Sequence, residues 1–161
     1  MRIDYIYSSW VEEFKPSGEV KVIFNGRGYL RGKGGSVYLF SAPIKPFYMA
    51  VHGEWVRGVL YEPGEVNGFS LIPCERSEGD KVRVRLVVRG VFKEGVLKDG
   101  VYTAPVDWRG RHKHVVTVVG AVKVGGVRPQ GALVSRHRAG FALSWLWREG
   151  YKGVVSLKFT K

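Results

Sequence analysis

Hydrophobic and charged positions alternate most clearly between Lys81 and Phe92, where the sequence reads KVRVRLVVRGVF. With a period of two, Val82, Val84, Leu86 and Val88 fall on one face of this segment, and Val87 interrupts the pattern of the other face. Lys81, Arg83, Arg85 and Arg89 fall on the other face, and no acidic residue lies among them. The pattern predicts a half-buried β-strand with a cationic outer face. Such a row of like charges needs water, salt or an anionic partner to screen it.

Short alternating or β-branched segments, separated by glycine and proline turns, recur along the whole chain. They predict about ten strands, with turns at Asn25-Gly26 and Gly34-Gly35. Ser9 and Glu12 have the spacing of a capping box, which predicts a helical turn over Ser9–Phe14. The expected strands are 2–7, 19–24, 29–30, 36–42, 47–52, 55–61, 65–72, 81–92, 112–124 and 154–159.

The segment 135–149 is the one long helix that the sequence predicts, with Ser135 as N-cap and Gly150 just past its end. Residues 141–147 are too evenly apolar for a surface helix, and Gly140 weakens the helix prediction, so a strand is the alternative. We therefore expect a mainly β fold, with α+β as the alternative class. The strands would form a barrel-like, sandwich or curved sheet in one domain, 1–161.

Basic residues dominate the composition, with 26 lysines and arginines against 14 acids and a net charge of +12. The basic residues are also segregated, because no acid occurs in residues 20–53, 81–93 or 108–148. This excess indicates a polyanionic partner. Asparagine, glutamine and methionine are scarce, which favours a thermophilic source. The lone Cys74 excludes an internal disulfide.

The N-terminal residues MRIDYIYSSW lack the apolar core of a signal peptide, and no segment has the apolar length that spans a bilayer. The basic residues lie in strand and loop patterns rather than on an amphipathic helix. We therefore expect a cytoplasmic protein without a membrane partner.

Nucleic acid, as RNA or single-stranded DNA, is the partner that this charge pattern favours. Arginine binds phosphate with two parallel hydrogen bonds, and aromatic side chains beside cations stack on unpaired bases. Glycines in residues 25–36 allow a close approach of the backbone to phosphate. The candidate binding residues are Arg27, Tyr29, Arg31, Lys33, Arg83, Arg85, Arg89, Trp108, Arg109, Arg111, Lys113, Arg136 and Arg138.

Two alternative functions remain open from the sequence. A metal-independent ribonuclease would use His112 or His114 as base or acid, together with Tyr102. A structural subunit of a nucleoprotein or viral particle, including a homo-oligomer, would use the apolar segments 115–124 and 145–147 as an interface. The cations beside the histidines disfavour a metal, and no nucleotide motif is present, so neither metal nor cofactor is expected. We favour a binding protein over an enzyme.

Overall fold

Fourteen β-strands and their connecting turns make up the protein, whose computed structural model describes residues 1–161. The mainly β prediction is confirmed, and the α+β alternative is wrong because the chain contains no helix. The strands are β1 (Arg2–Phe14), β2 (Glu19–Arg31), β3 (Val37–Ala42), β4 (Ile44–His52), β5 (Val56–Glu62), β6 (Asn67–Pro73), β7 (Lys81–Phe92), β8 (Leu97–Lys98), β9 (Val101–Arg109), β10 (Arg111–Val119), β11 (Lys123–Arg128), β12 (Leu133–His137), β13 (Gly140–Trp147) and β14 (Gly150–Thr160).

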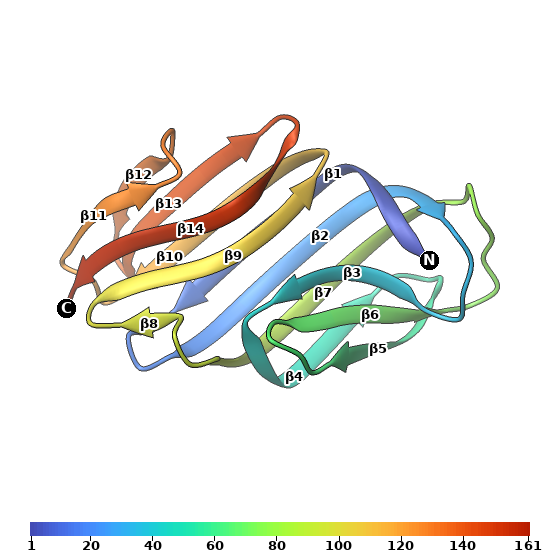
Figure 1. Ribbon diagram of the computed structural model, residues 1–161, viewed down its shortest axis with the longest axis horizontal. Coiled ribbons are helices and arrows are strands. Elements are labelled where there is room, and N and C mark those ends of the chain that lie inside the picture. The colour runs from blue at the N-terminus through green and yellow to red at the C-terminus, as the bar shows by residue number, and fades with distance from the viewer.

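The strands form two sheets. The larger sheet has ten strands in the order β12-β13-β10-β1-β2-β7-β4, and β3, β6 and β5 extend it from β1. The smaller sheet has the order β11-β14-β9-β8. Figure 1 shows the smaller sheet lying across one half of the larger sheet, while β3, β6 and β5 curl over the other half. The larger sheet is therefore nearly closed and barrel-like at one end, and the two sheets form a sandwich at the other.

Long central strands join these two halves. β1 pairs antiparallel with β2 and parallel with β10, and β2 pairs antiparallel with β7. Alternate side chains of these strands point inward, as the period of two requires. They belong to one continuous cluster of 30 buried hydrophobic residues that fills both halves. The predicted strand Lys81–Phe92 is confirmed at both ends as β7, and its buried side chains include Val82, Val84, Leu86 and Val88.

The turn predicted at Asn25-Gly26 is wrong, because β2 continues through its glycines to Arg31. A Cβ atom at Gly26 would lie 2.6 Å from the ring of Tyr5, and one at Gly28 would overlap the main-chain oxygen of Asp4. These glycines allow β1 to pass close to β2 rather than reversing the chain. The helical turn expected over Ser9–Phe14 is wrong as well, since β1 continues to Phe14.

The late helix predicted over 135–149 is also wrong, because this segment contains the hairpin of β12 and β13. Gly140 has a φ of +150°, and a Cβ atom there would overlap the main-chain oxygen of Val118. Only glycine allows this close approach to β10. Leu143 and Trp145 are buried, whereas Leu146 is half exposed, so the segment alternates as a strand does.

The chain contains no helix with the length and apolarity needed to cross a membrane.

Candidate functional site

Cationic side chains from three strands share the outer face of the larger sheet. Residues in register on neighbouring strands project to the same side. The first row across the sheet runs from Arg111 of β10 through Tyr7 of β1 and Arg27 of β2 to Arg83 of β7. The three arginines are exposed. The acid-free stretches around residues 27, 83 and 111 therefore meet on one face.

A second row lies two residues further along the same strands. It consists of Lys113 of β10, Ser9 of β1, Asn25 of β2, Arg85 of β7 and His52 of β4. Lys113 and Arg85 are exposed like the arginines of the first row. The two rows together make a continuous basic surface across β10, β1, β2, β7 and β4.

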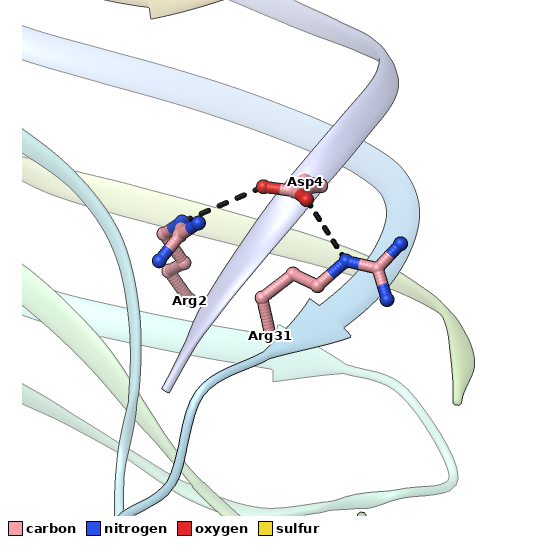
Figure 2. A network of polar contacts seen from close by, with 3 residues as sticks. All are labelled: Arg2, Asp4 and Arg31. Carbon is pink, nitrogen blue, oxygen red and sulfur yellow. Dashed lines mark hydrogen bonds and ion pairs between the residues drawn. The ribbon is translucent and has the colours of Figure 1, made fainter. Parts of the chain in front are cut away.

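No acidic side chain lies within ion-pair distance of the cations in the two rows. The protein has three ion pairs, and two of them share Asp4. Figure 2 shows Asp4 between Arg2 and Arg31, whose Nε atoms lie 3.5 and 3.0 Å from its two carboxylate oxygens. The charge of Arg31, a predicted binding residue, is thus offset within the protein. Arg27 has no acidic partner and lies over the ring of Tyr7, 5.7 Å from its centroid.

A hollow of about 670 Å³ opens on this surface between β2, β7 and the β4–β5 turn. We call it the cationic hollow, and its charged lining is Arg27, Arg76, Lys81, Arg83, Arg85 and Glu54. Arg76 and Glu54 were not predicted as binding residues, because they come from the loops before β7 and between β4 and β5. Neither loop carries a motif that would have identified them.

Other predicted binding residues lie away from the hollow. Arg109 ends β9 in the smaller sheet, and Lys33 lies in the loop after β2. Arg136 of β12 is in register with Phe141 of β13, which is in register with the buried Val118 of β10. Residues in register share a face of the sheet, so Arg136 lies on the face opposite to the two cationic rows.

Three more of the predicted binding residues lie outside the hollow. Arg138 lies in the turn between β12 and β13. Arg89 shares the basic face, opposite Lys21, but lies beyond the hollow. Tyr29 is exposed opposite Lys81 and carries Arg31 over its ring at 5.9 Å.

Trp108, which was predicted to stack on bases, is only 6% exposed. Its ring stacks on the imidazole of His112, with 4.0 Å between the ring centroids. Its Nε1 atom is buried without a hydrogen-bond partner. The side chain belongs to the interior of the sandwich, so the prediction of a surface platform is wrong for this residue.

The two histidines predicted as catalytic are also inside the protein. Nδ1 of His112 is 2.7 Å from Oγ of Ser8, and Nε2 of His112 is 3.2 Å from Nδ1 of His114. Burial lowers the pKa of His112 to about 2, with the neighbouring His114 as a second cause, and burial lowers the pKa of His114 to about 3. Both imidazoles are therefore neutral and out of reach of a substrate.

Tyr102, the third predicted catalytic residue, is buried against Glu12. Its hydroxyl donates a hydrogen bond of 2.7 Å to Oε2 of Glu12, and Nε1 of Trp10 donates one of 3.0 Å to Oε1. Burial raises the pKa of Glu12 to about 7, although the two hydrogen bonds act to lower it. Burial and the nearby Glu12 raise the pKa of Tyr102 well above its ordinary value. The predicted ribonuclease site is wrong, because its side chains form an internal network.

No cluster of three or more histidine, cysteine, aspartate or glutamate side chains is placed to hold a metal ion. The side chains that gather on the basic surface are instead arginines and lysines, which are hydrogen-bond donors suited to anionic groups.

Solved structures with a similar fold include zinc metallopeptidases. The M1 zinc metallopeptidase from Deinococcus radiodurans matches with a TM-score of 0.60 and 10% identity, over 97% of this chain and 42% of that chain. A mutant of that enzyme bound to a Tyr-Ser-Ala substrate matches with a TM-score of 0.59 and 9% identity over the same shares. A two-domain M1 zinc metallopeptidase mutant bound to L-tryptophan matches with a TM-score of 0.58 and 9% identity, again over 97% and 42%.

No protein-family model matches the chain, and no curated protein matches its sequence. The structural likeness, at about a tenth identity, shows a shared fold, and this chain spans 42% of the length of those structures. That finding overturns the predicted function of nucleic-acid binding, together with its ribonuclease and nucleoprotein-subunit alternatives. The fold is similar to that of one part of these metallopeptidase structures.

Proposed function

We propose that this chain is a non-catalytic β-domain of a peptidase-related protein, which acts together with a separate zinc-bearing part. The observation that carries the proposal is the match of 97% of this chain to 42% of a zinc metallopeptidase chain. One of the matching structures is described as having two domains, so a match of this extent corresponds to a domain rather than to the whole enzyme.

The residues of this chain support a non-catalytic role. Zinc metallopeptidases commonly bind their metal through a His-Glu-Xaa-Xaa-His motif on a helix. This chain has four histidines and neither that motif nor a helix. His112 and His114 are buried, whereas His52 and His137 lie at the surface on separate strands. Hydrolysis would therefore depend on residues outside the 161 described here.

The first test asks whether the chain alone binds zinc or cuts peptide. The purified chain is saturated with Zn²⁺, desalted and assayed for retained zinc by mass spectrometry and for hydrolysis of Tyr-Ser-Ala by chromatography. We expect neither stoichiometric zinc nor product. One retained zinc per chain with product formation would show that the chain is a complete enzyme and refute the proposal.

The second test asks whether the domain is equivalent to its structural counterpart. In the active Deinococcus radiodurans enzyme, the matching part is either deleted or replaced by this chain, and hydrolysis of Tyr-Ser-Ala is measured. We expect the chimera to exceed the deletion protein. A folded chimera that is no more active than the deletion protein would contradict the equivalence of the two domains.

A further inference from the structure

We propose that the cationic hollow is a docking site for an acidic segment of a partner polypeptide, bound in extended form along β7. The assignment of a polypeptide rests on the proposed function, whereas the preference for negative charge rests on the hollow alone. The charged lining comprises five cationic side chains and the single carboxylate of Glu54.

Unpaired positive charge is the first argument. None of the five cations of the hollow takes part in an ion pair. Arg27 and Arg83 are directly opposite in the register of β2 and β7, where like charges repel. Binding of carboxylates would relieve this repulsion, and arginine forms paired, charge-assisted hydrogen bonds with a carboxylate.

The spacing of the cations along β7 is the second argument. Lys81, Arg83 and Arg85 occupy alternate positions on the exposed face of one strand. Alternate residues of a strand are about 6.8 Å apart, and an extended peptide repeats its side chains at the same interval. A segment with acids at every second position would therefore present one carboxylate to each cation. Block-like acidic segments would place half of their carboxylates on the wrong side.

Rigidity of the platform is the third argument. β7 lies between β2 and β4 and is hydrogen-bonded to both. Nε1 of the buried Trp55 donates a hydrogen bond of 2.6 Å to the main-chain oxygen of Arg83, which ties the β4–β5 turn to β7. Arg27 is held over Tyr7 from the neighbouring strand. The backbone under the cations is therefore fixed before a ligand arrives, which lowers the entropy lost on binding.

The size of the hollow fits a short peptide segment. Its volume of about 670 Å³ lies within the range of about 300–1,000 Å³ that is typical of ligand sites. The five cations come from two strands and the loop before β7, so a ligand with several carboxylates can contact more of them than a single small anion can. Glu54, the one carboxylate of the lining, would repel a ligand of uniformly high negative charge and would accept a hydrogen bond from an uncharged peptide group.

The experiment measures fluorescence polarisation of a labelled octapeptide of alternating glutamate and serine with the full chain at low salt. The hollow variant carries Arg83→Ser and Arg85→Ser. The matched control carries Arg136→Ser and Arg138→Ser, which change the net charge equally on β12 and the turn that follows it. All four residues are exposed, and thermal melts confirm that both variants are folded.

We expect the hollow variant to lose affinity by at least about tenfold and the control by less than about twofold, because charge-assisted hydrogen bonds contribute this much. The peptide with four glutamates followed by four serines should bind more weakly than the alternating one. Equal losses in both variants, or no binding at low salt, would overturn the proposal. Inorganic phosphate or an oligonucleotide of equal charge that binds more tightly at the same residues would overturn the choice of ligand. None of these outcomes involves zinc or hydrolysis, so they are distinct from a failure of the proposed function.

Discussion

Glu12 is a carboxyl buried between two sheets, and its replacement by glutamine tests the interior of the sandwich. Glutamine keeps the shape of the side chain and can still accept from Trp10 and donate to Tyr102. The pKa of Glu12 is raised from 4.5 to about 7, a difference that corresponds to about 3 kcal/mol at about 1.4 kcal/mol per pKa unit. This is a large share of the free energy of unfolding of a typical domain.

The direction in which stability changes with pH follows from the linkage between protonation and folding. A carboxyl whose pKa is higher in the folded than in the unfolded protein stabilises the fold below pH 4.5, and this contribution is lost as the pH rises through about 7. His112 and His114 act in the opposite sense, because their lowered pKa values make stability fall as the pH drops below 6.5. Both histidines are present in wild type and variant, so the difference between the two proteins isolates Glu12.

Urea denaturation followed by tryptophan fluorescence, over a pH series at constant ionic strength, measures this difference. We expect Glu12→Gln to gain about 3 kcal/mol relative to wild type between pH of about 4 and about 8, or roughly 6–12 °C in Tm. Glu13→Gln is the control, because Glu13 is exposed on the opposite face and should give a flat difference. Parallel stability curves for wild type and Glu12→Gln would refute the burial of a titrating carboxyl.

Three further changes test other parts of the fold. Gly140→Ala should destabilise the protein by about 2–4 kcal/mol in urea denaturation, because the added Cβ atom would overlap the main chain of β10 and the residue has a positive φ. Gly125→Ala is the control, because a Cβ atom there has open space, and it should change stability by less than about 1 kcal/mol. Arg83→Thr should stabilise the sheet by about 0.5 kcal/mol at low salt, because it removes a positive charge opposite Arg27. The gain in stability should vanish in high salt, and a gain that persists there would contradict the electrostatic reason. Val134→Lys should lower any self-association seen by sedimentation, because β12 is an edge strand with exposed apolar side chains; unchanged association would show that this edge is not involved.

The strands that could be predicted from the sequence are those whose pattern is complete within the segment. β7 alternates almost throughout, with Val87 as an interruption, and both of its ends were predicted. β13 is paired with β10 on one side and β12 on the other, and it is apolar on both faces. Even half-exposed residues such as Leu146 are apolar, so the sequence of β13 does not show the alternation of apolar and polar residues that marks a strand. A local pattern cannot separate a buried helix from such a strand, and the close approach at Gly140 becomes visible only with β10 in place.

The direction of the histidines in β10 was predictable in part. His112 and His114 have the same parity as Val116 and Val118, which are fully buried. That parity indicates an inward direction, while Lys113 and its neighbours of the other parity project outward. Residue types suited to catalysis outweighed this signal in the sequence analysis, although alternation is the stronger physical constraint on a strand.

The basic surface depends on strand order, which the sequence does not contain. Tyr7 and Ser9 of β1 carry no charge, yet they bridge the cations of β10 to those of β2. The parallel pairing of β1 with β10 joins residues about a hundred positions apart, and no local pattern predicts it. The charge excess could be read from composition, but its concentration on one face required the register.

A requirement for solubility alone does not account for this arrangement. The chain has acids in the loops that flank β6 and β7, such as Glu65, Glu75 and Glu78, and a mixed surface would keep the same solubility with less repulsion. Arg27 and Arg83 instead face each other across neighbouring central strands, and neither has a carboxylate within ion-pair distance. Repulsion of this kind lowers the stability of the free protein at low salt, and either salt or a bound anionic group relieves it. This arrangement is the reason for proposing the hollow as a docking site, and the loss of affinity on replacing Arg83 and Arg85 is the measurement that tests the proposal.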